Sequence, residues 1–150
     1  MAAWIFPTAF NPTSNGIIAK RTDFQTASTY TMFLWNNGAA DYQLFADIGQ
    51  DRFRGNQVIS TNLWYHVAVV FNGSLPENQR VRLFVNGTLV GEFAEATDTF
   101  PLEQSPVHVG CLPVSGPAQE FSGKIDEVAI WTRALGSAEI LRLFQATAPL

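Results

Sequence analysis

The stretch "WYHVAVVFNGSLPENQRVRLFVNGTLVGEF", residues 64–93, decides the fold. Successive side chains of a strand point to opposite faces, and in residues 64–71 both faces are largely apolar. This pattern predicts a strand buried between two layers. Further along, Val81, Leu83 and Val85 share one face. Asn86-Gly87 then predicts a tight hairpin, because a type I′ turn requires positive φ at both central residues.

Short segments of the same kind lie on both sides of this stretch, separated by Gly, Asn and Pro. We expect further strands at residues 2–6, 16–20, 29–35, 41–48, 52–60, 105–112 and 124–131. Only residues 137–145 carry a helical period, with Gly136 as the N-cap and Glu139 as half of a capping box. Many short strands followed by one helix predict an all-β sandwich or barrel.

Composition narrows the class of protein. A chain of 150 residues, 47% of them hydrophobic, suits one domain with one core. The formal charge of −4 and the absence of a Lys/Arg cluster argue against a nucleic-acid partner. The apolar runs are too short to cross a membrane, and the first ten residues do not form a signal peptide. With Cys111 as its single cysteine, the chain cannot form an intrachain disulfide.

At this level of detail the chain resembles a known family. Residues 64–93 resemble the middle hairpin of laminin-G-like, concanavalin-A-like jelly rolls, with the pattern W-x-H-V-A, a turn, and a strand ending V-N-G. "FSGKIDEVAIWTRALGSAEI", residues 121–140, resembles the closing strand and short helix of the same family. The resemblance implies an antiparallel two-sheet jelly-roll sandwich with one short C-terminal helix. It also suggests an extracellular protein, or a fragment of an exported one.

The sequence departs from the family at its start. The one or two strands that normally precede residues 2–6 are absent, so we expect residues 1–150 to form one domain without them. Unpaired edges near residues 2–6 and 124–131 would then favour a homodimer by edge pairing or strand exchange. The competing account is that residues 10–15 or the C-terminal tail cover the gap in a monomer. In relatives, acids of the missing segment can contribute to a calcium site, so we expect weak calcium binding or none.

Asp126 and Glu127 are the acids that could suggest an enzyme. Glycoside hydrolysis needs two carboxylates that flank one bond, and in a strand only residues two apart share a face. Asp126 and Glu127 are adjacent and have no acid two positions away. We therefore expect no catalytic residue, and instead a structural role in which these acids bond loop amides or pair with Lys124 or Arg133. Asp126 remains a weak candidate for a calcium ligand, as the family suggests.

The two histidines and the cysteine give no sign of a reactive site. His66 lies in the middle of a predicted strand, and with only one other histidine a three-histidine zinc site is impossible. We expect His66 to be a core imidazole with its hydrogen bonds satisfied, and Cys111 to be a buried, inert thiol.

One hairpin carries the groups that would suit a glycan. Sugar rings stack on flat aromatic faces while amides and carboxylates bond their hydroxyls. Around the predicted turn at residues 36–41, such groups are offered by Trp35, Asn36, Asn37, Asp41 and Tyr42. The alternative is an aromatic core cluster with an ordinary turn. The function we favour is non-catalytic recognition of a glycan or a protein surface, without a cofactor. The alternatives are a glycoside hydrolase on the same fold and a structural or assembly domain.

Overall fold

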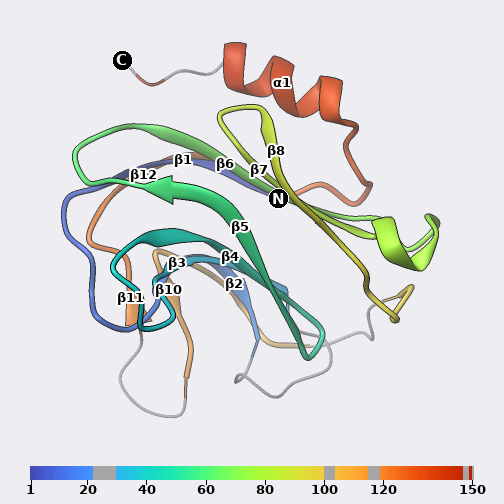
Figure 1. Ribbon diagram of the computed structural model, residues 1–150, viewed down its shortest axis with the longest axis horizontal. Coiled ribbons are helices and arrows are strands. Elements are labelled where there is room, and N and C mark those ends of the chain that lie inside the picture. The colour runs from blue at the N-terminus through green and yellow to red at the C-terminus, as the bar shows by residue number, and fades with distance from the viewer. Residues whose placement is uncertain (22–29, 100–103, 115–118, 147–148, 150) are drawn as a thin grey trace.

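The computed structural model describes residues 1–21, 30–99, 104–114, 119–146 and 149. Two five-stranded antiparallel sheets pack face to face (Figure 1). Sheet A contains, in spatial order, β12 (Gly123–Ala129), β1 (Ala2–Pro7), β6 (Tyr65–Phe71), β7 (Val81–Val85) and β8 (Thr88–Phe93). Sheet B contains β5 (Asp51–Ile59), β4 (Tyr42–Ile48), β3 (Tyr30–Trp35), β2 (Asn15–Lys20) and β9 (Val107–Val109). The predicted two-sheet sandwich is confirmed.

The main core lies between the inner faces of the two sheets. From β7, the predicted face of Val81, Leu83 and Val85 is buried there, each side chain with no exposed surface. From β6, Tyr65, Val67 and Val69 join the same core, whereas Ala68 and Val70 are buried on the opposite side of sheet A. Strand β6 is therefore covered on both faces, as its doubly apolar sequence predicts. Each fully buried Val or Leu contributes about 1.5–3 kcal/mol to stability.

Helix α1 (Ser137–Ala146) covers the outer face of sheet A, at the top of Figure 1. Its buried Ile140 packs in a cluster with Ala68, Val70 and Phe84 of the sheet. The helix begins as predicted, because Glu139 Oε2 accepts the backbone N–H of Gly136 at 2.8 Å. Arg133 also bonds the Glu139 carboxylate, and these donors lower the pKa of Glu139 to about 2. In the described part of the chain no helix is long and apolar enough to span a membrane.

The hairpin between β7 and β8 confirms the predicted Asn86-Gly87 turn. The φ angles of Asn86 and Gly87 are 50° and 76°, and Val85 pairs directly with Thr88. The Asn86 side chain also ties the turn to β6 by a hydrogen bond, since its Oδ1 accepts the backbone N–H of His66 at 2.9 Å. The turn packs under α1, where a Cβ on Gly87 would lie 2.8 Å from a methyl carbon of Leu141.

Strand β1 is not an open edge, in contrast to the expectation for residues 2–6. It pairs with β6 on one side and with β12 on the other, so its backbone groups have partners in both neighbours. No described strand pairs with the outer edge of β12. A bulge interrupts β12, because Ala2 pairs with Ala129 but Trp4 pairs with Asp126, and Glu127 has a φ of 49°. Bulges and the exposed charges of this strand are devices that discourage edge-to-edge pairing.

The predicted strand at residues 105–112 is divided in two. Gly110, with a φ of 80°, separates β9 from β10 (Cys111–Leu112), and β10 then forms a hairpin with β11 (Gln119–Glu120). The hairpin lies against sheet B, to which Gly110 is tied by a backbone bond from its N–H to the carbonyl of Ile17. Most of the C-terminal tail proposed to cover a gap lies outside the described residues.

Candidate functional site

The five residues of the predicted sugar-binding hairpin do not share one surface. Trp35, at the end of β3, pairs with Gln43, whereas Tyr42 is the neighbouring residue and points to the other face of sheet B. Tyr42 stacks on Phe10 with ring centroids 4.1 Å apart, and its hydroxyl donates to the carbonyl of Asn11 at 2.8 Å. Trp35 packs on the outer face instead, against Phe45.

The polar residues of this hairpin form its turn. Asn36 Oδ1 accepts the backbone N–H of Gly38 at 3.1 Å, and the Asn36 carbonyl accepts that of Ala39. Asn37 adopts a φ of 46°, which Asn tolerates better than most residues. Asn37 and Asp41 are exposed. Of the five predicted residues, Trp35 is therefore the one that lies on the outer face of sheet B, Tyr42 points to the other face, and Asn36, Asn37 and Asp41 belong to the turn.

The outer face of sheet B carries an aromatic cluster. Phe33 and Phe45 are buried and stack with ring centroids 5.7 Å apart, and the partly exposed Trp35 lies 5.4 Å from Phe45. The guanidinium carbon of Arg52 lies 5.2 Å from the centroid of Phe33 and 5.1 Å from that of Trp35. The side chain of Arg52 is therefore held against aromatic rings rather than extended into solvent.

Arg52 belongs to a charged triad with Asp47 and Arg21. Its Nε and Nη2 donate to the two carboxylate oxygens of Asp47 at 2.6 and 2.9 Å, and Arg21 Nη1 donates to Oδ2 at 3.1 Å. Arg21 and Asp47 are almost completely buried. Asp47 is fixed in turn, since its backbone N–H donates to the hydroxyl of Thr31. The two guanidinium groups are thus positioned by one rigid carboxylate.

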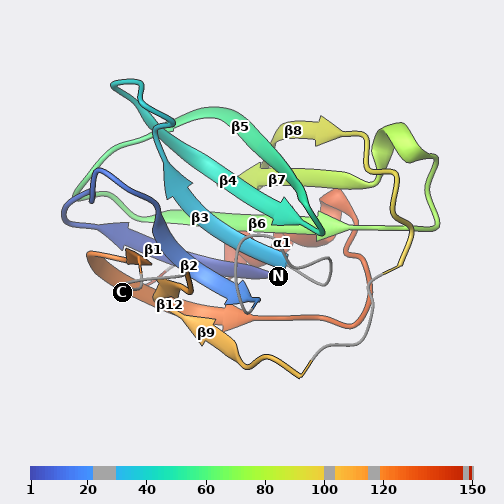
Figure 2. The same ribbon diagram turned by 90° about the horizontal axis from the view of Figure 1, so that it is seen from below.

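Trp35 and the two arginines of the triad, Arg21 and Arg52, line a pocket of about 490 Å³, which we call the Trp35 pocket. Six of its lining residues can stack on a ligand or bond with it: Thr13, Ser14, Arg21, Trp35, Arg52 and Gln119. Leu112 and Val114, from β10 and the residues after it, supply an apolar wall, and Gly38 brings the turn to the rim. The pocket lies on the side of sheet B that faces away from α1; Figure 2 shows β2, β3 and β4 side by side on that half of the molecule.

Gly16 allows the hairpin to form this wall. A Cβ at Gly16 would lie 2.3 Å from the backbone carbon of Cys111 and from the backbone nitrogen of Leu112. Only glycine therefore permits β10 to lie directly on β2 at this point. Arg21 adds a second tie, because its Nε donates to the carbonyl of Pro113 at 2.9 Å.

Sequence reasoning missed Arg21, Arg52 and Gln119. Alternation in β5 gave a partial signal, since Arg52 and Arg54 are exposed on either side of the buried Phe53. That pattern indicates an outward-facing arginine, but it does not say which residue the arginine meets across the sheet. The contact between Arg52 and Trp35 depends on the register of β4 with both β3 and β5.

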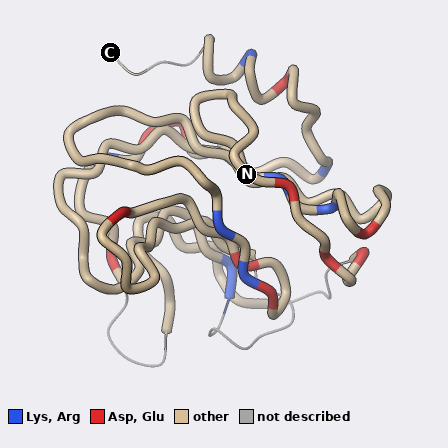
Figure 3. The backbone as a smooth tube through the Cα atoms, viewed as in Figure 1, with Lys and Arg blue, Asp and Glu red and all other residues tan. Residues whose placement is uncertain are grey.

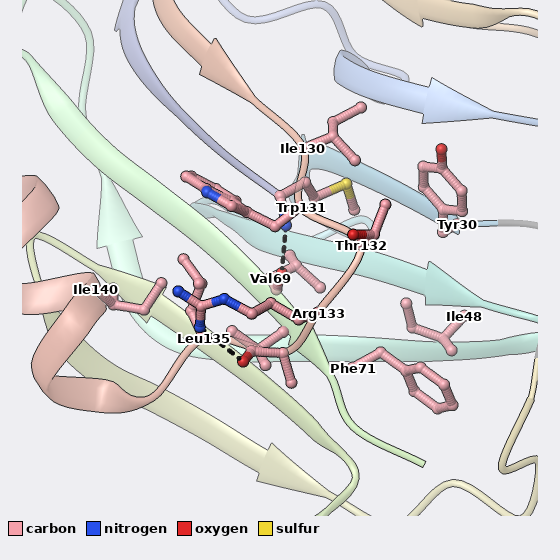
Figure 4. A pocket seen from close by; sticks show the side chains of 13 residues that line it. Tyr30, Ile48, Val69, Phe71, Ile130, Trp131, Thr132, Arg133, Leu135 and Ile140 are labelled. Carbon is pink, nitrogen blue, oxygen red and sulfur yellow. Dashed lines mark hydrogen bonds between the residues drawn. The ribbon is translucent and has the colours of Figure 1, made fainter. Parts of the chain in front are cut away.

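A second pocket, of about 360 Å³, opens between the two sheets and the segment 130–135 (Figure 4). In Figure 4, Tyr30, Ile48 and Phe71 lie on one side of this end pocket, and Trp131, Arg133 and Leu135 lie on the other. Its lining is mainly apolar, and Arg133 is engaged by Glu139 at 2.7 Å. The end pocket therefore offers few groups that could bond a polyhydroxylated ligand.

The acids of β12 take only part of the structural role expected of them: Asp126 bonds a backbone amide, but the expected pairing with Arg133 is not made. Asp126 and Glu127 are exposed, and the expected partner Arg133 pairs with Glu139 instead. The hydrogen bond within this pair is local: Asp126 Oδ1 accepts the backbone N–H of Glu127 at 2.8 Å. The described residues hold no group of three His, Cys, Asp or Glu side chains that could hold a metal. Two exposed carboxylates do not fit calcium, which takes six to eight oxygens.

His66 and Cys111 differ in part from expectation. His66 is buried as predicted, but its Nδ1 has no hydrogen-bond partner in the described part of the chain. Cys111 is half-buried rather than buried, and its Sγ lies 3.8 Å from Nδ1 of His108. Neither residue is in the described lining of the Trp35 pocket, although Cys111 directly precedes the wall residue Leu112.

Together, the two five-stranded sheets, the covering helix and the pocket on sheet B define a concanavalin A-like sandwich. Residues 1–141 match the sequence profile of Laminin_G_3, the concanavalin A-like lectin/glucanases superfamily. The chain therefore belongs to this family. A comparison with curated proteins finds no match.

Solved structures of the same fold cover nearly the whole chain. A protein from Bacteroides ovatus, proposed to bind carbohydrate, aligns with a TM-score of 0.76 at 20% identity over 94% of this chain. The heptameric SAP-like pentraxin of Limulus polyphemus gives a TM-score of 0.70 at 17% identity over 95% of the chain. Domain 4 of an extracellular GH43 arabinanase from Geobacillus stearothermophilus, in complex with arabinotriose, gives 0.68 at 21% over 96%. This chain spans 39%, 67% and 65% of those three proteins, respectively.

Proposed function

We propose that this chain is a non-catalytic carbohydrate-binding module that holds a sugar in the Trp35 pocket. The observation that carries the proposal is a partly exposed Trp35 beside hydrogen-bonding side chains in a pocket of about 490 Å³. An indole face suits the apolar side of a sugar ring, and Arg52, Gln119 and the hydroxyls of the rim can bond sugar oxygens. The neighbours of known structure, two of which are named for carbohydrate binding or a bound sugar, support the same class of ligand.

A glycoside hydrolase is the less favoured alternative. It would need an acid and a base or nucleophile on either side of the scissile bond, about 5–10 Å apart. No Asp or Glu is among the described residues that line the Trp35 pocket, and Asp47 beneath it is bonded by two arginines. The pocket therefore suits binding without hydrolysis.

A glycan array followed by calorimetry tests the proposal. We expect wild-type protein to bind at least one oligosaccharide and Trp35→Ala to weaken that binding at least tenfold, since the stacking surface is lost. Trp64→Ala is the matched control, because Trp64 is also partly exposed but packs against Phe6 of sheet A. Equal affinity of wild type and Trp35→Ala for every bound glycan would refute the Trp35 pocket as the site. Hydrolysis of a bound oligosaccharide would refute the non-catalytic assignment.

A protein-binding or assembly role is the third alternative, and it includes the expected homodimer. The homodimer was expected to form by edge pairing at residues 2–6 and 124–131. Because β1 lies in the interior of sheet A, the outer edge of β12 is the place where a second copy could pair. Val128 and Ile130 are exposed there, at 38% and 46%. Light scattering tests it: a monodisperse mass near 16.5 kDa at micromolar concentration would exclude a stable dimer.

A further inference from the structure

The chain contains four Asn-Gly pairs, at residues 15–16, 37–38, 72–73 and 86–87. We propose that one of them, Asn37-Gly38, is a site of spontaneous covalent modification, at which the Asn37 side chain loses its amide and leaves a carboxylate at the rim of the Trp35 pocket. The loss of the amide does not depend on the proposed function, whereas its effect on sugar binding rests on that function.

The reaction of an Asn-Gly pair needs only water and a base in solution. The backbone nitrogen of Gly38 gives up its proton and bonds to Cγ of Asn37. The bond from Cγ to Nδ2 breaks, and Nδ2 takes up a proton and leaves as ammonia. Water then opens the cyclic imide, at Cγ to give aspartate or at the backbone carbonyl carbon to give isoaspartate. A following glycine favours ring closure, because it has no Cβ to hinder the approach of its nitrogen.

The side chains of the other three asparagines are held by hydrogen bonds. Asn15 is completely buried, and its amide bonds backbone groups of β3 and of the preceding loop. Asn72 Oδ1 accepts the backbone N–H of Ser74 at 3.1 Å, and Asn86 Oδ1 accepts that of His66 at 2.9 Å. Each of these bonds has to break before Cγ can turn toward the next backbone nitrogen.

The glycines of those three pairs are confined as well. A Cβ on Gly73 would lie 1.7 Å from the carbonyl oxygen of Asp98. One on Gly16 or Gly87 would lie 2.3 or 2.8 Å, respectively, from its nearest neighbour. A Cβ on Gly38, in contrast, would meet none of the described atoms within 4 Å. The backbone therefore has room to move at Gly38 and little room at the other three glycines.

Asn37 and Gly38 lie in the exposed turn between β3 and β4. The Asn37 side chain has no hydrogen-bond partner among the residues that the structure describes. A hydrogen bond does oppose the reaction at the attacking nitrogen, because the N–H of Gly38 donates to Asn36 Oδ1 at 3.1 Å. That bond is exposed to solvent, and exposed backbone hydrogen bonds open at little cost. The structure thus leaves Asn37-Gly38 as the reactive pair.

The modified residue would change the rim of the Trp35 pocket, because Gly38 lines this pocket. Figure 3 marks Asp and Glu in red, and residues 36–40 contain neither. The product would therefore bring a carboxylate, ionised at neutral pH, into an uncharged turn. Isoaspartate would also add a methylene group to the backbone directly before Gly38. We expect the added charge and the longer backbone to weaken sugar binding.

Peptide mapping by mass spectrometry measures the reaction at each pair. Folded protein is kept for weeks at pH 6, 7 and 8 in water enriched in a heavy oxygen isotope. We expect the peptide with Asn37 to lose ammonia and gain one heavy oxygen at least tenfold faster than the peptides with the other three pairs. Its rate should rise with pH, because the attacking nitrogen must lose a proton. In guanidinium chloride, which unfolds the chain, the four rates should approach one another.

Variants then locate the reaction. Asn36→Ala releases the N–H of Gly38 and should accelerate the loss of the amide severalfold. Asn37→Gln should prevent it, because the longer side chain closes a ring much more slowly. Asn62 is the internal control, since it is exposed and has a φ of 62° but is followed by Leu63, whose Cβ hinders the attack. We expect Asn62 to stay intact in the folded protein.

Binding to a sugar found on the array tests the effect on the pocket. Aged wild-type protein should bind at least threefold more weakly than fresh protein, whereas aged and fresh Asn37→Gln should bind equally. Unchanged affinity of wild type after Asn37 has reacted would refute the effect on the pocket. The modification itself is refuted if another pair reacts as fast in the folded protein, or if Asn37 reacts only in denaturant. If no glycan binds, the proposed function is wrong, and the mass measurement alone then confirms or refutes the modification.

Discussion

The imidazole of His66 lies edge-on against the indole of Trp4, with ring centroids 5.5 Å apart and an angle of 65° between the ring planes. The ring of Phe144 from α1 lies 6.4 Å from the same imidazole. His66 is thus enclosed between sheet A and the helix, and burial lowers its pKa from 6.5 to about 4.

Stability should depend on this histidine at mildly acidic pH. The unfolded chain takes up a proton at His66 near pH 6.5, while the folded chain does so only near pH 4. Stability should therefore fall as the pH falls through this interval, by about 1–3 kcal/mol from His66. Urea unfolding at pH 7, 5 and 4 measures it. We expect His66→Phe to lose this part of the pH dependence and His108→Phe to retain it. Identical pH profiles for wild type and His66→Phe would contradict the assignment.

Gly16→Ala should damage both the fold and the binding site. The new Cβ would clash with the backbone of β10, which cannot move aside as a flexible side chain would. We expect a loss of about 2–3 kcal/mol in the free energy of unfolding, together with weaker sugar binding, since the wall formed by Leu112 moves. Gly136→Ala is the control, because its Cβ would meet only Glu139 Oε2 at an ordinary 3.7 Å. Unchanged stability of Gly16→Ala would show that β10 does not lie on β2 as described.

Glu127→Gly should stabilise the protein. Glu127 has a φ of 49° within the bulge of β12, a conformation that costs a non-glycine residue about 1 kcal/mol. Its side chain is exposed, so little is lost with it. We expect a gain of about 0.5–1 kcal/mol in chemical denaturation, and a loss for Val128→Gly next to it. A lower stability of Glu127→Gly would count against the bulge.

Asp126→Ala should lower the free energy of unfolding by less than about 1 kcal/mol, because the side chain of Asp126 is exposed. The loss of a buried hydrogen-bonding partner would instead cost about 1–3 kcal/mol.

Calcium should bind weakly or not at all. The acids of β12 are Asp126 and Glu127, and Asp126 Oδ1 already accepts a backbone N–H. We expect 5 mM calcium to change the melting temperature by less than about 2 °C, since most of the required oxygens would have to come from water. A rise of several degrees that EDTA reverses, and that Asp126→Asn abolishes, would refute this expectation.

The elements that could be predicted are those whose signal is local. Strand β6 is apolar on both faces within seven residues, Asn86-Gly87 encodes its own turn, and α1 carries a helical period with Glu139 at N3. In each case neighbouring residues determine the structure without knowledge of distant contacts. The jelly-roll arrangement followed from resemblance rather than from these local signals.

The candidate site was harder to predict because it depends on register. Trp35 was identified, but its neighbour Arg52 belongs to a strand two positions away in sheet B, and it reaches Trp35 across β4. Similarly, Tyr42 was grouped with Trp35 because both flank one turn, and only the pairing of Trp35 with Gln43 places them on opposite faces. The bulge at Glu127 arises from a mismatch between β12 and β1, so β12 alone carries no sign of it.

The position of β1 between β6 and β12 has a consequence for how the chain folds. Ala2 pairs with Ala68 and with Ala129, so β1 needs partners that are synthesised much later than itself. At about 5–20 residues per second, residues 2–7 would wait roughly 10 s for β12. Pairings this distant in sequence also slow refolding, to milliseconds or seconds. Until β6 and then β12 emerge, the uncharged segment 2–6 is an unpaired apolar strand, which is the kind of segment that a chaperone protects from aggregation.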